Sequence, residues 1–133
     1  MESNCIDMIG DLWSIHLAII GILISVITLL YASLYSKVEE LDGIKNSTDY
    51  VLMNRATAVR NSITKLRELS KHAMYGIIIT LGLLVLTTFL KYRPDSCIIN
   101  CLTVCDAIFT ICLIVYGLYL GYEVYSHYQK KTT

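Results

Sequence analysis

The feature that most constrains this chain is an apolar run from Cys97 to Tyr125, in which Asp106 is the only charged residue before Glu123. A run of about 18 or more apolar residues with almost no charge is typical of a membrane-spanning helix. Two further runs, residues 12–35 and 73–90, hold no Lys, Arg, Asp or Glu. The sequence therefore predicts an all-α, three-helix polytopic membrane protein with spans at about 12–35, 73–91 and 97–123.

The Lys and Arg residues predict how these spans are oriented, because cytoplasmic loops of membrane proteins are enriched in basic residues. Residues 36–72 hold seven of the 11 basic residues and the C-terminal tail holds two, whereas the segment before residue 12 holds none. We therefore expect a multi-pass protein of the cell inner (plasma) membrane, with its N-terminus outside and its C-terminus in the cytoplasm. The first ten residues are expected to be a short external tail.

Residues 36–72 are predicted to form a cytoplasmic helical hairpin that continues two of the spans as a stalk. Gly43 is expected to end its first helix, and Thr48 or Asp49 to cap its second. Apolar and small residues recur there at the alternating spacings of a heptad seam: Leu52, Ala56, Val59, Ile63, Leu66 and Ser70. The seam favours packing inside one chain, and the alternative is a docking or gating surface.

The second half of this stalk is rich in cations, which are candidates for contact with a cytoplasmic protein partner or with lipid headgroups. They are Arg55, Arg60, Lys65, Arg67 and Lys71. Cations near an anionic membrane surface contribute about 1 kcal/mol each to lipid attraction. The orientation rule for basic residues is by itself enough to explain the cluster.

Small and hydroxyl-bearing residues follow one side of the first span at spacings of four and three. They are Ser14, Ala18, Gly21, Ser25, Thr28 and Ala32. Membrane helices pack closely where such residues line their interfaces, and a water-exposed pore lining is the second interpretation. Both apply in an oligomer whose helices meet around an axis. His16, near the outer end, is expected to bond water or backbone rather than to relay protons.

Asp106 lies about nine residues inside its span, or about 13 Å deep at 1.5 Å per residue. A charge near the centre of a bilayer costs at least about 3 kcal/mol, so the side chain is expected to face away from lipid. Thr103 and Thr110 share its helix face. Counting residues from the outer ends of the other spans brings small or hydroxyl residues to the same level, namely Gly21, Ser25 and Thr80.

Three roles are open for Asp106. It can be protonated and bonded to a hydroxyl, because burial favours the neutral form of a carboxyl group. It can form part of a ring in a cation-conducting pore. It can also take up and release protons as a carrier site.

Other functions find no support in the sequence. It has no pairing of nucleophile and base and no glycine-rich phosphate loop, so we expect no enzyme. The cysteines have no metal-ligand spacing, and neither a metal nor another cofactor is expected. With a formal net charge of +0 and no isolated basic face, nucleic acid is not an expected partner.

Two resemblances bear on function. Three spans with an outside N-terminus and an inside C-terminus resemble class I phage holins, which usually have shorter loops than the stalk found here. The basic, heptad-bearing segment RATAVRNSITKLRELSKHAMYGIII, residues 55–79, runs directly into a span. It resembles small SLATT-type membrane effectors of bacterial phage-defence systems. This resemblance implies a pore-forming or depolarising effector that is switched by a cytoplasmic partner or signal.

Two hypotheses of function follow. The first is a homo-oligomeric membrane channel or pore-type effector that perturbs membrane permeability, since one copy has too few helices to enclose a water path. The second is a non-conducting membrane anchor or sensor subunit that recruits a cytoplasmic partner through residues 36–72. A ring of copies with Asp106 or the small-residue seam at its axis would favour the first. A monomer or dimer with Asp106 bonded to a hydroxyl inside one bundle would favour the second.

Overall fold

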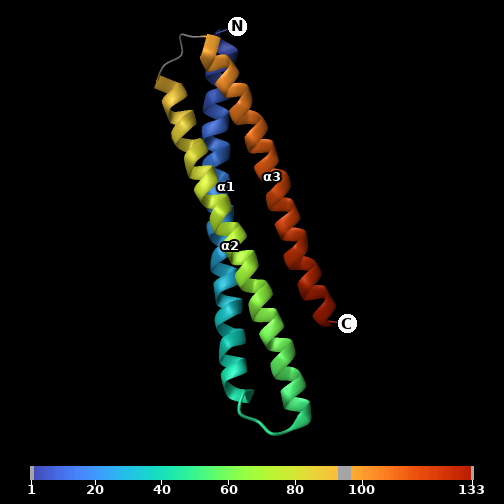
Figure 1. Ribbon diagram of the computed structural model, residues 1–133. Helices are drawn as coiled ribbons and strands as arrows, with labels where there is room; N and C mark the ends of the chain where they lie inside the picture. Colours follow the sequence, from blue (N-terminus) through green and yellow to red (C-terminus); the bar gives the residue numbers. More distant parts are fainter. Residues whose placement is uncertain (1, 93–96, 133) are drawn as a thin grey trace.

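The structure, a computed structural model, describes residues 2–92 and 97–132 and consists of three long helices (Figure 1). They are α1 (Glu2–Ile44), α2 (Tyr50–Tyr92) and α3 (Cys97–Thr132). In the described residues each helix contains a stretch that is long and apolar enough to cross a membrane. The expected all-α fold with three candidate membrane spans is therefore confirmed.

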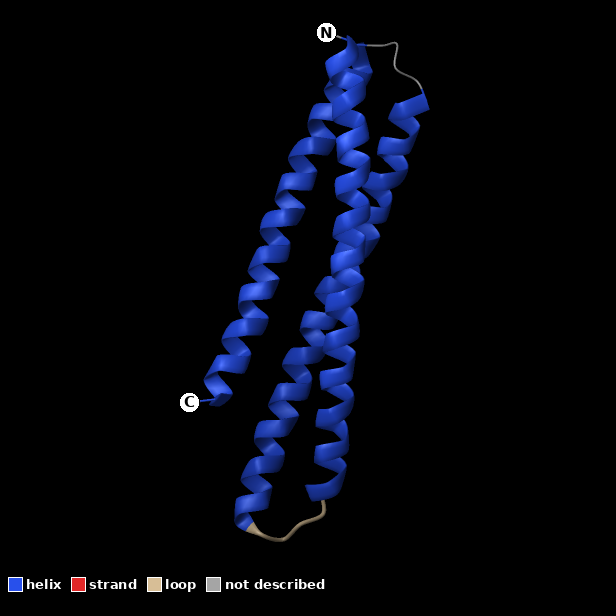
Figure 2. Ribbon diagram, turned by 180° about the vertical axis from the view of Figure 1, so that it is seen from behind, coloured by secondary structure: helices blue, strands red, loops and turns tan. Residues whose placement is uncertain are grey.

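The first two helices form an antiparallel hairpin, and α3 lies beside them from the end that holds the N-terminus (Figures 1 and 2). The helices α1 and α2 have 43 residues each, so each is about 65 Å long. That is about twice the thickness of a hydrocarbon core of about 30 Å. Because α3 ends short of the hairpin loop, the α1–α2 hairpin extends beyond the three-helix part of the bundle (Figure 1).

Local hydrogen bonds define the loop end of the hairpin. Asp49 caps α2, because its Oδ1 accepts a 2.9 Å hydrogen bond from the Val51 amide and its carbonyl accepts one from the Met53 amide. The expected C-terminal cap at Gly43 was wrong. No described glycine has a positive φ, and α1 continues to Ile44. A left-handed cap is not needed here, because the Lys45 amide donates a further helical hydrogen bond, 2.9 Å long, to the Leu41 carbonyl.

The expectation of a separate N-terminal tail was also wrong, since α1 begins at Glu2, whereas the side of the membrane on which this end lies stays a prediction. Apolar packing explains the difference. Ile9 is 3% exposed and lies in a small apolar cluster with Leu90 and Ile99 from the other two helices. Burial of such side chains offsets the entropy of ordering the segment. The first turns of α1 therefore belong to the bundle.

The heptad seam of α2 faces the interior, as intramolecular packing requires. Its buried members include Val59, Ile63 and Leu66. Leu66 belongs to a second apolar cluster, formed with Leu30, Leu69 and Leu120, in the half of the bundle nearer the loop. The Leu23 side chain of α1 packs against Gly76 of α2, where an added Cβ would lie 3.3 Å from Leu23 Cδ1. The two clusters leave an interval along the bundle that polar side chains fill.

Candidate functional site

Four buried polar side chains from all three helices meet between the two apolar clusters. His16 comes from α1, Thr87 from α2, and Asp106 and Thr110 from α3. The first three have no exposed surface and Thr110 is 3% exposed. We call this group the polar cluster.

Short contacts connect the cluster across every helix interface. The Thr87 hydroxyl donates a 2.6 Å hydrogen bond to Asp106 Oδ2 and lies 3.1 Å from His16 Nδ1. His16 Nε2 lies 2.8 Å from the Thr110 hydroxyl and 3.5 Å from Asp106 Oδ1. Unlike the apolar contacts around it, this arrangement is directional, and it contributes to the register of the three helices.

The heavy-atom distances define how protons can be arranged. Thr87 has one hydroxyl proton, and when Asp106 receives it the Thr87 oxygen can accept from His16 Nδ1–H. His16 Nε2 then accepts from Thr110. Asp106 Oδ1 has no hydrogen-bond partner among the described side chains, although Nε2 is 3.5 Å away.

Local helix chemistry holds the threonines in position. The Thr110 hydroxyl lies 2.8 Å from the Asp106 carbonyl oxygen, and the Thr87 hydroxyl lies 2.8 Å from the Leu83 carbonyl oxygen. Such contacts four residues back along a helix restrict a β-branched side chain to few rotamers. The hydroxyl groups are thus presented to the other helices in fixed directions.

Of the residues that the sequence grouped with Asp106, Thr110 is the one whose side chain belongs to the polar cluster. Thr103 and Thr110 are buried on its helix face, and Thr80 is buried on α2. Thr103 and Thr80, however, donate to carbonyl groups of their own helices, at 2.8 and 2.7 Å.

The small-residue seam of α1 points away from the bundle. Gly21, Ser25 and Thr28 are all exposed, and both hydroxyl groups donate to carbonyls of α1. The rest of the seam is exposed as well: Ser14, Ala18 and Ala32. The seam therefore does not pack against the other helices of this chain, and close packing against a neighbouring copy or a pore lining stays a prediction. The side of α1 that faces α2 instead presents larger residues such as Leu23 and Leu30.

Sequence reasoning missed His16 and Thr87 as partners of the acid. Counting depth from the first apolar residue of each span assumed that all three runs begin in one plane. In the structure Asp106 meets His16, only four residues after Leu12, and Thr87, only three before Leu90. His16 was the one signal available, because it is an ionisable group inside an apolar run.

The structure divides the five stalk cations into two that form ion pairs with described residues and three that do not. Arg55 donates to Glu40 Oε1 at 2.8 Å, and Lys65 lies 3.4 Å from Glu123 Oε2 on α3. Hydrogen bonds from Lys37 and then Arg55 lower the pKa of Glu40 below its ordinary value. Within the described residues Arg60, Arg67 and Lys71 form no ion pair. These three are the cations left for an external partner.

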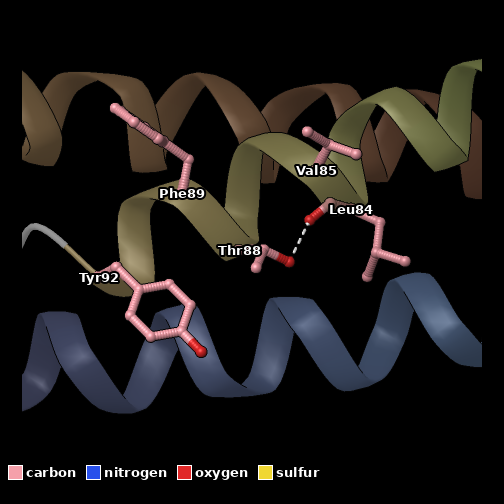
Figure 3. Close-up of a pocket in the computed structure, with 5 residues that line it drawn as sticks. All are labelled: Leu84, Val85, Thr88, Phe89 and Tyr92. Carbon is pink, nitrogen blue, oxygen red and sulfur yellow. Dashed lines mark hydrogen bonds between the residues drawn. The ribbon is translucent and has the colours of Figure 1, made fainter.

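A groove on the outer face of α2 does not extend the site. Its lining comes from this one helix: Leu84, Val85, Thr88, Phe89 and Tyr92 (Figure 3). The only hydrogen bond drawn there joins the Thr88 hydroxyl to the Leu84 carbonyl, at 2.8 Å. Val85 and Phe89 point outward from α2, as expected for a surface that faces lipid.

Comparison with protein-family models, with curated proteins and with solved structures finds no match to this chain. The class that the fold defines is a small all-helical protein with three candidate membrane spans. Its candidate functional site is a buried His–Asp cluster that connects all three helices.

Proposed function

We propose that this protein is a membrane anchor or sensor subunit of the plasma membrane that recruits a cytoplasmic protein through its helical hairpin. The proposed orientation has the N-terminus outside and both the hairpin and the C-terminus in the cytoplasm. Lys and Arg are concentrated in the hairpin and the C-terminal tail, which supports this orientation.

The observation that carries the proposal is the apolar surface at the start of α2, next to the hairpin loop. Tyr50, Val51 and Met53 are 76%, 70% and 56% exposed. This part of α2 lies about 30 Å of helix before the apolar run that starts at residue 73, so lipid tails do not cover it. Exposed apolar patches outside a membrane are typical of protein–protein contact sites.

The polar cluster supports a sensor role for the same molecule. Asp106 is bonded to the Thr87 hydroxyl inside one three-helix bundle, so its carboxylate is directed to no neighbouring copy. Both α1 and α2 run without a break from this cluster to the hairpin loop. A change in the contacts of this cluster would therefore be carried along both helices to the hairpin.

Site-specific photo-crosslinking in the host cell tests the proposal. A photoreactive amino acid at Val51 is expected to give a discrete adduct with a soluble protein, and the double substitution Tyr50→Ser/Met53→Ser should remove that adduct. The same probe at Ile108, an exposed position in the middle of α3, is the control and should react with lipid. An adduct only with a second copy of this chain would contradict recruitment.

The second candidate is a homo-oligomeric membrane channel or pore-type effector, such as a phage-defence effector. It is supported by the outward direction of the α1 seam, where the exposed Ser25 and Thr28 would line an axis shared by several copies. Purified protein in liposomes would then pass ions, and Ser25→Leu/Thr28→Leu would abolish the flux. Cys112→Leu, at an exposed position of α3, is the control. Absence of flux, alone and with the crosslinked partner, would end this candidate.

A further inference from the structure

The register of α1 against α2 places cations beside an apolar surface. Tyr31 and Leu34 belong to the uncharged run 12–35, whereas Arg67 and Lys71 precede the run that begins at residue 73. By sequence alone these pairs fall on opposite sides of the membrane boundary. In the structure all four line one groove, with a volume of about 400 Å³, between the two helices.

The groove has two chemically different halves. Arg67 and Lys71 lie toward the hairpin loop, and Met74 and Ile78 follow one and two turns further along α2. No Asp or Glu lines the groove, and in the described part of the chain neither cation forms an ion pair. Tyr31 and Tyr75 stand at its walls, 53% and 62% exposed, at the depth where tyrosine is enriched in membrane proteins.

We propose that this groove binds one anionic phospholipid of the surrounding leaflet. The phosphate lies between Arg67 and Lys71, which supply charge-assisted hydrogen bonds. One acyl chain follows Met74 and Ile78 toward the membrane centre. A lipid matches both halves at once, whereas a soluble anion leaves the apolar half unfilled. Apart from the groove itself, this inference requires only that the three candidate spans cross a membrane. It is independent of either proposed function.

Lipid retention by the full-length protein tests the site. Native mass spectrometry in a mild detergent would compare phosphatidylglycerol with phosphatidylcholine of the same acyl chains. Wild-type protein is expected to retain one phosphatidylglycerol in preference to phosphatidylcholine. The substitution Arg67→Gln/Lys71→Gln should weaken this retention about thirtyfold, the effect of two cations near a membrane surface.

Two controls separate a defined site from diffuse attraction. Arg60→Gln/Lys130→Gln also removes two exposed cations but leaves the groove intact, so it should retain the lipid. Met74→Trp keeps both charges and fills the apolar half, so it should lower retention. Circular dichroism would show that each variant is folded.

Three results would overturn the proposal. Equal loss in the two double variants would mean that only net charge matters. Equal retention of phosphatidylcholine by the wild-type protein would remove the role of the cations. Competition by inorganic phosphate at the concentrations at which the lipid binds would assign the groove to a soluble anion instead.

Discussion

The hydroxyl of Thr87 donates a 2.6 Å hydrogen bond to Asp106 Oδ2, and this contact joins α2 to α3 inside the apolar part of the bundle. Both side chains have no exposed surface. Water cannot replace a lost partner there, so the contact contributes more than an exposed hydrogen bond would.

Removal of the Thr87 hydroxyl is expected to destabilise the bundle. Thr87→Val keeps the shape of the side chain but leaves Asp106 Oδ2 without its donor, so the free energy of unfolding should fall by about 1–2 kcal/mol. Thr88→Val is the matched control, because the Thr88 hydroxyl bonds only to the Leu84 carbonyl of its own helix. Unfolding in detergent or nanodiscs would measure both, and equal losses would contradict the role given to Thr87.

The His16–Asp106 pair is expected to show energetic coupling. Asp106→Asn keeps the shape of the carboxyl group, and its amide oxygen can still accept from Thr87, so the helices should still assemble. A double-mutant cycle with His16→Gln should give a coupling energy of about 1 kcal/mol, since Nε2 and Oδ1 are 3.5 Å apart. His72→Gln is the comparison, because His72 contacts Tyr116 and not the cluster. Coupling of similar size to His72 would show that the effect is not local.

The close approach of α1 and α2 predicts different tolerance at two glycines of the same helix. At Gly76 an added Cβ would lie 3.3 Å from Leu23 Cδ1, whereas at Gly82 it would meet nothing within 4 Å. Gly76→Leu should therefore destabilise the hairpin by about 1–3 kcal/mol through overpacking. Gly82→Leu should leave thermal stability in detergent nearly unchanged. If both variants melt alike, the two helices do not meet at Gly76.

The ion pairs of Glu40 predict a pH dependence at the hairpin. The pKa of Glu40 is lowered by Lys37 and Arg55. The carboxylate therefore stabilises the folded hairpin fully at pH values above the ordinary pKa of a glutamate. That contribution is lost as the pH falls through the lowered value. Because these groups are near the surface, the effect is a few tenths to about 1 kcal/mol.

Hydrogen exchange of the amides in the first turns of α2 would measure this effect. Glu40→Gln should weaken protection at neutral pH and match the wild-type protein in acid. Asp42→Asn removes the exposed Asp42–Lys45 ion pair at the end of α1, so it should change protection of α2 little. If the difference in protection between the wild-type protein and Glu40→Gln stayed the same as the pH fell into the acid range, the Glu40 ion pairs would not be the cause.

The residues that the sequence grouped by helix face were grouped correctly. Thr103, Asp106 and Thr110 recur at helical spacing, and all three are buried on one face of α3. The inward heptad seam of α2 follows from the same local periodicity, and the spans follow from the length of the apolar runs. A helix face depends only on spacing along one chain segment, so it can be determined without knowledge of the partner.

Only the tertiary structure decided which residues stand opposite one another. Spacing within a helix says nothing about how far one helix is shifted along its neighbour. In this bundle that shift brings His16 and Thr87 to Asp106, and the rotation of α1 about its axis leaves Ser25 outside. It also brings Arg67 and Lys71 beside Tyr31. Helix register results from side-chain packing across interfaces, such as Gly76 against Leu23, which no single periodicity contains.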